Sequence, residues 1–162
     1  MNLVGGKRLS DVRDEKGAST LVIDGIEILS LLHIPVTGAS VITLSLKTGS
    51  GATLQGCSFK ANGGKFVVKG KDYKGFFAWS DTLPEVAEFE YRPGRKIPKE
   101  GFLITVANAW IQGGTPWKHI GNSGMIVESF VLDEGRQWIC RCSDGIGEVN
   151  FDDLRIEIMV TP

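Results

Sequence analysis

The sequence predicts an all-β fold, an antiparallel two-sheet sandwich of jelly-roll type, formed by a single domain over residues 1–162. Apolar and polar residues alternate with the period of two that a half-buried strand requires. Turn-forming residues separate these runs at intervals of roughly 8–15 residues, which is typical of sandwiches and barrels. No segment carries an apolar stripe of helical period over three turns. The polar residues 8–16 predict no more than a short surface turn within an irregular segment over residues 1–18.

In the first half of the chain, strands are predicted near residues 20–32, 41–47, 52–59, 65–69 and 75–80. In the second of these, aliphatic side chains at even positions alternate with polar ones at odd positions, so one face is expected to be buried. Asp24-Gly25 marks a turn inside the first run. Asn62-Gly63-Gly64 separates the third run from the fourth and predicts a β-hairpin there.

In the second half, strands are predicted near residues 87–91, 102–111, 125–132, 137–142 and 154–160. Residues 102–111 are apolar at both even and odd positions, which predicts a central strand covered on both faces. Before the last strand the parity of the apolar positions changes, because Val149 and Phe151 are odd whereas Leu154 and its successors are even. A bulge or bend at Asp152-Asp153 is the simplest explanation.

Composition restricts the function before any motif is considered. Eighteen basic and 19 acidic residues give a net charge of -1, so no nucleic-acid partner is expected. The chain contains no run of about 20 apolar residues, which is the length that a transmembrane helix requires, so no membrane partner is expected either. The N-terminus carries no apolar run of the secretory type. We therefore expect a cytoplasmic protein or a part of a larger secreted one.

The chain has three cysteines, Cys57, Cys140 and Cys142, and their odd number argues against a closed disulfide framework. Cys140 and Cys142 share one strand face, and a zinc site would need two more ligands, for which only His33 and His119 exist. Reduced, buried side chains are the favoured interpretation. No cofactor is expected from these residues.

Catalytic motifs give little support for an enzyme. The chain has no GxSxG, HExxH or GxxxxGK[ST] motif. Glu88 and Glu90 share a strand face, and the favoured interpretation is a solvated sheet surface rather than a glycosidase pair. Five lysines between residues 60 and 74 could bind an anion, but protection of a strand edge is favoured.

A loop rich in glycine and proline gives the strongest indication of a ligand. It presents Trp117 beside His119, and an exposed indole flanked by hydrogen-bonding groups suits the C–H face of a sugar. Trp79 is a second candidate platform, with Asn122 and Asp81 as further polar partners.

Two stretches resemble carbohydrate-binding modules of the galactose-binding-like jelly-roll class. They are GEVNFDDLRIEI at residues 147–158 and VTGASVITLSLKTG at residues 36–49. The resemblance implies a two-sheet jelly roll that binds sugar on a concave sheet face or at a loop rim. It also implies a structural calcium ion at Asp152 or Asp153.

These observations lead to three functional hypotheses. The first is a non-catalytic binding module, most concretely for carbohydrate. The second is a cytosolic protein-interaction module, such as an assembly component or a toxin-neutralising, immunity-type sandwich. The third is a small β-barrel enzyme of cyclase type, whose apolar pocket would position its substrate.

Overall fold

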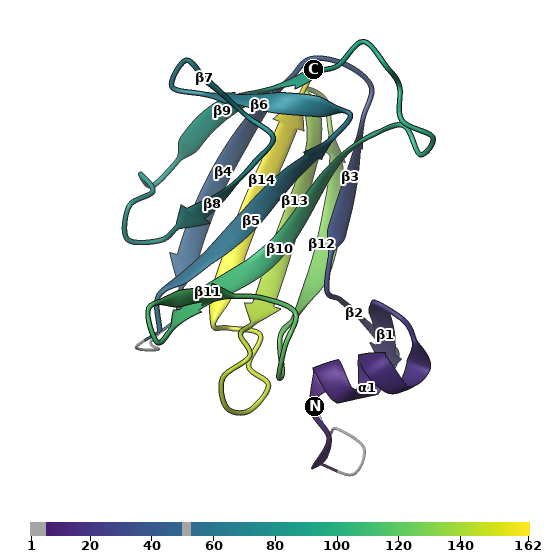
Figure 1. Cartoon of the computed structure of the whole chain (residues 1–162), viewed down its shortest axis with the longest axis vertical. Coiled ribbons are helices and arrows are strands. Elements are labelled where there is room, and N and C mark those ends of the chain that lie inside the picture. Colours follow the sequence, from purple (N-terminus) through teal and green to yellow (C-terminus); the bar gives the residue numbers. More distant parts are fainter. Residues whose placement is uncertain (1–5, 50–52) are drawn as a thin grey trace.

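The computed structural model describes residues 6–49 and 53–162, and its two antiparallel sheets confirm the predicted all-β sandwich (Figure 1). The large sheet contains, in spatial order, β1 (Thr20–Ile23), β2 (Ile26–Leu29), β12 (Gly124–Leu132), β13 (Gly135–Ser143), β14 (Leu154–Thr161), β4 (Ser40–Thr48), β9 (Ala87–Pro93), β6 (Gly64–Val68) and β7 (Lys71–Tyr73). The small sheet contains β11 (Thr115–Trp117), β10 (Phe102–Gln112), β5 (Gln55–Asn62) and β8 (Gly75–Trp79), and β3 (Leu32–Val36) pairs with the first half of β10.

The space between the sheets is filled by apolar side chains from both of them, and these include Ile42 and Leu44 from the predicted buried face of residues 41–47. Phe59 and Phe76 from the small sheet meet Phe66 and Phe89 from the large sheet, with ring centroids 5.1–6.1 Å apart. The predicted central strand is confirmed as β10, which is buried at both parities over residues 106–110. The two sheets are not closed into a barrel, and buried side chains pack between them. The enzyme hypothesis assumed a closed barrel with an apolar pocket, and the structure does not have that architecture.

The predicted hairpin at Asn62-Gly63-Gly64 is wrong. β5 pairs with β8 and β10, whereas β6 pairs with β7 and β9, so the chain passes here from the small sheet to the large one. The reason is that the apolar faces of β5 and β6 point toward each other across the core. Gly63, at φ +85°, turns the chain between the sheets. The Asp24-Gly25 turn, by contrast, does connect a hairpin, β1–β2.

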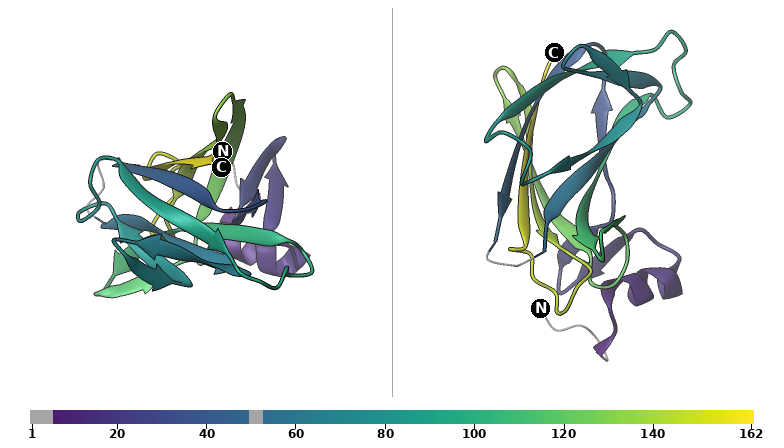
Figure 2. Two further views of the ribbon diagram at one scale, coloured as in Figure 1. Left: turned by 90° about the horizontal axis from the view of Figure 1, so that it is seen from above. Right: turned by 60° about the vertical axis from the view of Figure 1, so that its left-hand side comes forward.

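Residues 9–16 form a helix, α1 (Leu9–Lys16), where the sequence predicted only a surface turn. Leu9 is fully buried in a second apolar cluster with Leu21 and Ile28, which β1 and β2 supply. Two turns are too short to show an apolar stripe, so the stabilising contacts are tertiary. In the right-hand view of Figure 2, α1 lies beyond one end of the two sheets.

The parity change before the last strand has a simple cause. Val149 and Phe151 belong to a loop and pack against the second cluster, and β14 begins only at Leu154. Of the predicted bulge or bend at Asp152-Asp153, the structure has the bend, in a turn closed by the hydrogen bond from Asp153 N to Asn150 O (3.2 Å).

Candidate functional site

The structure does not bring the two predicted tryptophan platforms together. Trp117 on β11 lies opposite Trp110, whose side chain is buried between the sheets, and its own ring is 42% exposed at the edge. Trp79 on β8 lies opposite Gly56, which in turn pairs with Ala109, the residue before Trp110. Because neighbouring residues of a strand point to opposite faces, Trp79 and Trp117 project from opposite faces of the small sheet.

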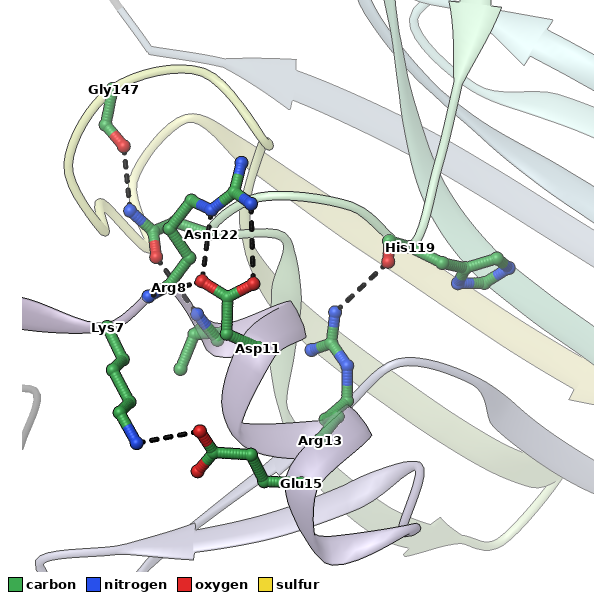
Figure 3. Close-up of polar contacts among 9 residues, drawn as sticks. Lys7, Arg8, Asp11, Arg13, Glu15, His119, Asn122 and Gly147 are labelled. Carbon is green, nitrogen blue, oxygen red and sulfur yellow. Dashed lines mark hydrogen bonds and ion pairs between the residues drawn. The ribbon is translucent and has the colours of Figure 1, made fainter.

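Asn122, predicted as a polar ligand partner, is engaged by the protein itself (Figure 3). Its side chain is buried, Oδ1 accepts a hydrogen bond from Leu9 N (3.1 Å), and Nδ2 donates one to Gly147 O (2.8 Å). Asn122 therefore caps the first turn of α1 from a distant part of the chain and fixes the loop around Gly147. This arrangement favours a structural role over ligand contact.

His119 lies near Asn122, and the backbone rather than the ring makes its contact with α1. The carbonyl of His119 accepts a hydrogen bond from Arg13 Nη2 (3.4 Å), while the imidazole is turned away from the helix (Figure 3). Burial lowers the pKa of the imidazole, and the positive charges of Lys118 and Arg13 lower it further. The neutral ring is thus favoured.

Asp152 and Asp153, where the resemblance implied calcium, have diverging contacts. Asp153 Oδ2 accepts a hydrogen bond from Asp144 N (3.1 Å), whereas the exposed Asp152 lies 3.6 Å from Arg141 Nη2. Within residues 6–49 and 53–162 no group of three or more His, Cys, Asp or Glu side chains is placed to hold a metal ion. The geometry gives the calcium hypothesis no further support, because hard cations need several oxygen ligands.

The outer side of the small sheet carries an aromatic pair, of which only one member, Trp79, was predicted from the sequence. We name this surface, formed by Gly56, Ser58, Phe77, Trp79, Ala107 and Ala109, the small-sheet face. The rings of Phe77 and Trp79 are nearly parallel, at an interplanar angle of 7° and a centroid separation of 5.4 Å, and Phe77 is 43% exposed. The alternation in Gly75-Phe-Phe-Ala-Trp79 is the signal that could have identified Phe77 together with Trp79.

Small residues make room for the aromatic rings on this face. A Cβ at Gly56 would lie only 2.5 Å from Trp79 Cε3, so the indole rests directly on the backbone of β5. Ala109 and Ala107 continue this low floor on β10. The rings are therefore supported from below by the sheet.

Basic side chains border the aromatic pair. Lys118 follows β11 and places its Nζ 5.9 Å from the centroid of the Phe77 ring, so its stem crosses the small residues of the face. A hollow of about 380 Å³ lies between Lys118, Lys60 and Lys74, with Phe77 on its wall. Asp81, the remaining predicted site residue, is exposed in the turn after β8, two residues beyond Trp79.

The cysteines offer no reactive group to this or any other surface. Cys57, Cys140 and Cys142 are free and buried in the main core. Burial raises the pKa of Cys140 to about 12 and raises the pKa of the other two thiols as well.

Comparison with protein-family models, with curated proteins and with solved structures finds no match to this chain. In the part of the chain that the structure describes, no helix is long and apolar enough to cross a bilayer. The small-sheet face and its basic surroundings are therefore the candidate site.

Proposed function

We propose that the chain is a non-catalytic, carbohydrate-binding module whose ligand packs against Phe77 and Trp79 on the small-sheet face. The observation that supports this most directly is the parallel aromatic pair on the outer side of a strand, in which Phe77 is exposed and Trp79 is partly buried. The C–H groups of a pyranose ring pack favourably on an aromatic face. The site thus retains Trp79 from the sequence-based hypothesis and replaces Trp117 with Phe77.

The surroundings of the pair also suit a hydroxylated ligand. Ammonium groups of Lys60, Lys74 and Lys118 border the hollow beside Phe77 and can donate hydrogen bonds to sugar oxygens. Asp81 in the following turn can accept them. Strands rather than long loops hold Phe77 and Trp79, so little conformational entropy is lost when a ligand binds.

Calorimetric titration with a panel of neutral and acidic oligosaccharides tests this proposal. We expect binding at millimolar concentrations or below, and a loss of about tenfold in affinity for Phe77→Ala and for Trp79→Ala. Trp117→Ala is the matched control, because it removes an exposed indole from the opposite face and should bind as the wild type does. The absence of any binding, or a loss confined to Trp117→Ala, would contradict the proposal.

A second candidate function, assembly, is favoured by the free edge of β12. Apart from the single pair Met125–Leu29, β12 pairs only with β13 among the described residues, and its exposed part over residues 128–132 has no strand paired on the other side. Phe130, Val131 and Leu132 are exposed there, Val131 by 83%. A long apolar edge is a template for pairing with another strand.

The occupant that this edge fits is a second copy of the chain. Antiparallel self-pairing centred on Phe130 places Ser129 opposite Val131 and Glu128 opposite Leu132, so no like charges meet. Sedimentation velocity should show a dimer that Val131→Lys abolishes, while Val86→Lys, at another exposed valine, leaves it intact. A monomer at all concentrations would contradict this candidate.

A further inference from the structure

A basic groove lies at the corner where the chain crosses between the sheets. It encloses about 590 Å³ at the end of the sandwich that carries β6 and β7 in Figure 1. Its basic lining consists of Lys65, Lys74, Arg92, Arg95, Lys96 and Lys99, and no carboxylate contributes to its wall. Residues 60–74 and 92–99 together hold nine of the 18 basic residues and a single acidic one, Asp72, in a chain whose net charge is -1.

Most of this positive charge is not neutralised within the protein. Lys65 pairs with Asp72 at 2.6 Å, and Arg92 pairs with Glu90 at 2.8 Å. The other four basic groups of the groove form no ion pair with any described residue: Lys74, Arg95, Lys96 and Lys99. Four like charges around one concave surface repel one another, and an anion bound among them relieves that repulsion.

The floor of the groove is backbone that leaves no room for side chains. Gly94 N donates a hydrogen bond to Gly63 O (2.8 Å), and a Cβ at Gly94 would lie 2.6 Å from that same oxygen. A Cβ at Gly64 would lie 2.5 Å from the hydroxyl of the buried Tyr91. The crossing thus fixes the backbone part of the groove, and the basic side chains form the rest of its wall.

Lys74 connects the groove to the small-sheet face. It lines both the groove and the hollow beside Phe77. Through Lys74, the hollow beside Phe77 therefore continues into the groove that Arg95, Lys96 and Lys99 line. A ligand that extends along it would meet aromatic rings at one end and unpaired cations at the other.

We infer that the carbohydrate ligand is an acidic glycan, with a sugar ring on Phe77 and Trp79 and its carboxylate or sulfate groups in the basic groove. This inference rests on the proposed function and names its ligand class. A single-stranded nucleic acid fits less well, because stacking platforms would have to recur along the groove, and none of the residues that line it is aromatic.

The test compares three hexasaccharides, an oligogalacturonate, a sulfated heparin fragment and the neutral xylohexaose, in calorimetric titrations of the full chain. We expect the acidic hexamers to bind at least tenfold more tightly than the neutral one, and the preferred one of the two to identify the anionic group. Affinity should fall with rising salt. Lys96→Gln/Lys99→Gln should weaken the acidic hexamer at least fivefold, whereas Lys16→Gln/Lys47→Gln, matched in charge and outside the groove, should not.

The outcomes separate this inference from the function on which it rests. Equal binding of neutral and acidic hexamers, abolished by Phe77→Ala, would overturn the acidic ligand and leave the carbohydrate-binding module. Acidic binding that Lys96→Gln/Lys99→Gln weakens and Phe77→Ala does not would confirm the anion groove and overturn the aromatic platform. Tighter binding of an oligodeoxythymidylate than of either acidic hexamer would overturn the inference in favour of nucleic acid.

Discussion

Gly56 and Trp79 illustrate how single residues position the candidate site. The indole lies against β5 only because position 56 has no side chain, and any Cβ there would collide with the ring. Nothing in the sequence near Trp79 indicates this, since the two residues meet through strand pairing across 23 positions of chain. Trp79 could therefore be predicted as a candidate, and the alternation along its strand could have added Phe77, whereas the support from Gly56 could not be predicted.

The thiols allow a direct test of the main core at the level of residues. Cys57, Cys140 and Cys142 are fully buried, and burial raises the pKa of each thiol. We expect a thiolate-specific reagent to modify none of them in the native protein and all three after denaturation. Spectrophotometric thiol titration measures this, and a thiol that reacts rapidly without denaturant would contradict the predicted packing.

His119 predicts a defined pH dependence of stability. Because burial and neighbouring cations lower its pKa in the folded state, protonation is less favourable there than in the unfolded chain. The resulting stability is fully present above the unfolded pKa of about 6.5 and is lost as the pH falls below it. Relative to His119→Asn, the wild type should lose free energy of unfolding on acidification, by at most about 1.4 kcal/mol per pH unit.

Asparagine is the appropriate replacement because it tolerates the left-handed backbone, φ +65°, that His119 adopts. Denaturant unfolding at several pH values between neutrality and mild acid gives the comparison. His33→Asn, at the exposed histidine of β3, serves as the control. Parallel pH profiles for the wild type and His119→Asn would be inconsistent with a perturbed imidazole.

At the level of elements, most strands were predictable because they carry their own period of two, whereas β3, the short strands β7 and β11, and the helix α1 were not predicted. The helix depends on contacts that span the chain: Leu9 packs on Ile28, Arg13 Nη1 donates to Ser123 O (2.8 Å), and Asn122 caps the first turn. The local sequence of α1 is polar and short, and such a segment is marginal as an isolated helix.

Replacement of Asn122 measures the contribution of that cap. Asn122→Ala leaves the Leu9 N–H and the Gly147 carbonyl without their partner, and we expect a loss of about 1–3 kcal/mol in the free energy of unfolding. Asn122→Asp keeps the acceptor for Leu9 N and adds a negative charge at the helix N-terminus, but it loses the donor to the Gly147 carbonyl, so it should recover only part of that loss. Urea unfolding of both variants provides the measurement, and equal losses would show that the cap contributes little.

The architecture of the whole molecule could be predicted only as a class. Two sheets follow from many short amphipathic strands, but the pairing does not, as Asn62-Gly63-Gly64 shows. That tripeptide has the chemistry of a tight turn and is used to cross between sheets, because Phe59 and Phe66 must face each other. The groove that we assign to an acidic ligand is a product of this crossing, and no local pattern could have revealed it.

The two apolar clusters predict that the molecule does not unfold as one unit. Leu9 belongs to the cluster beneath α1, β1 and β2, whereas Leu44 belongs to the main core between the sheets. Truncation of either leucine to alanine leaves a cavity and lowers the free energy of unfolding by about 2–5 kcal/mol. For Leu9→Ala we expect that cost to appear as local opening, because the elements around it form only one end of the sandwich.

Native-state hydrogen exchange distinguishes the two variants. Leu9→Ala should remove protection from amides of α1, β1 and β2 and leave β13, β14 and β4 as protected as in the wild type. Leu44→Ala, the matched control, should lower the protection of both sheets together. If Leu9→Ala instead weakened β13, β14 and β4 to the same extent as its own cluster, the helix and its hairpin would be an integral part of a single cooperative core.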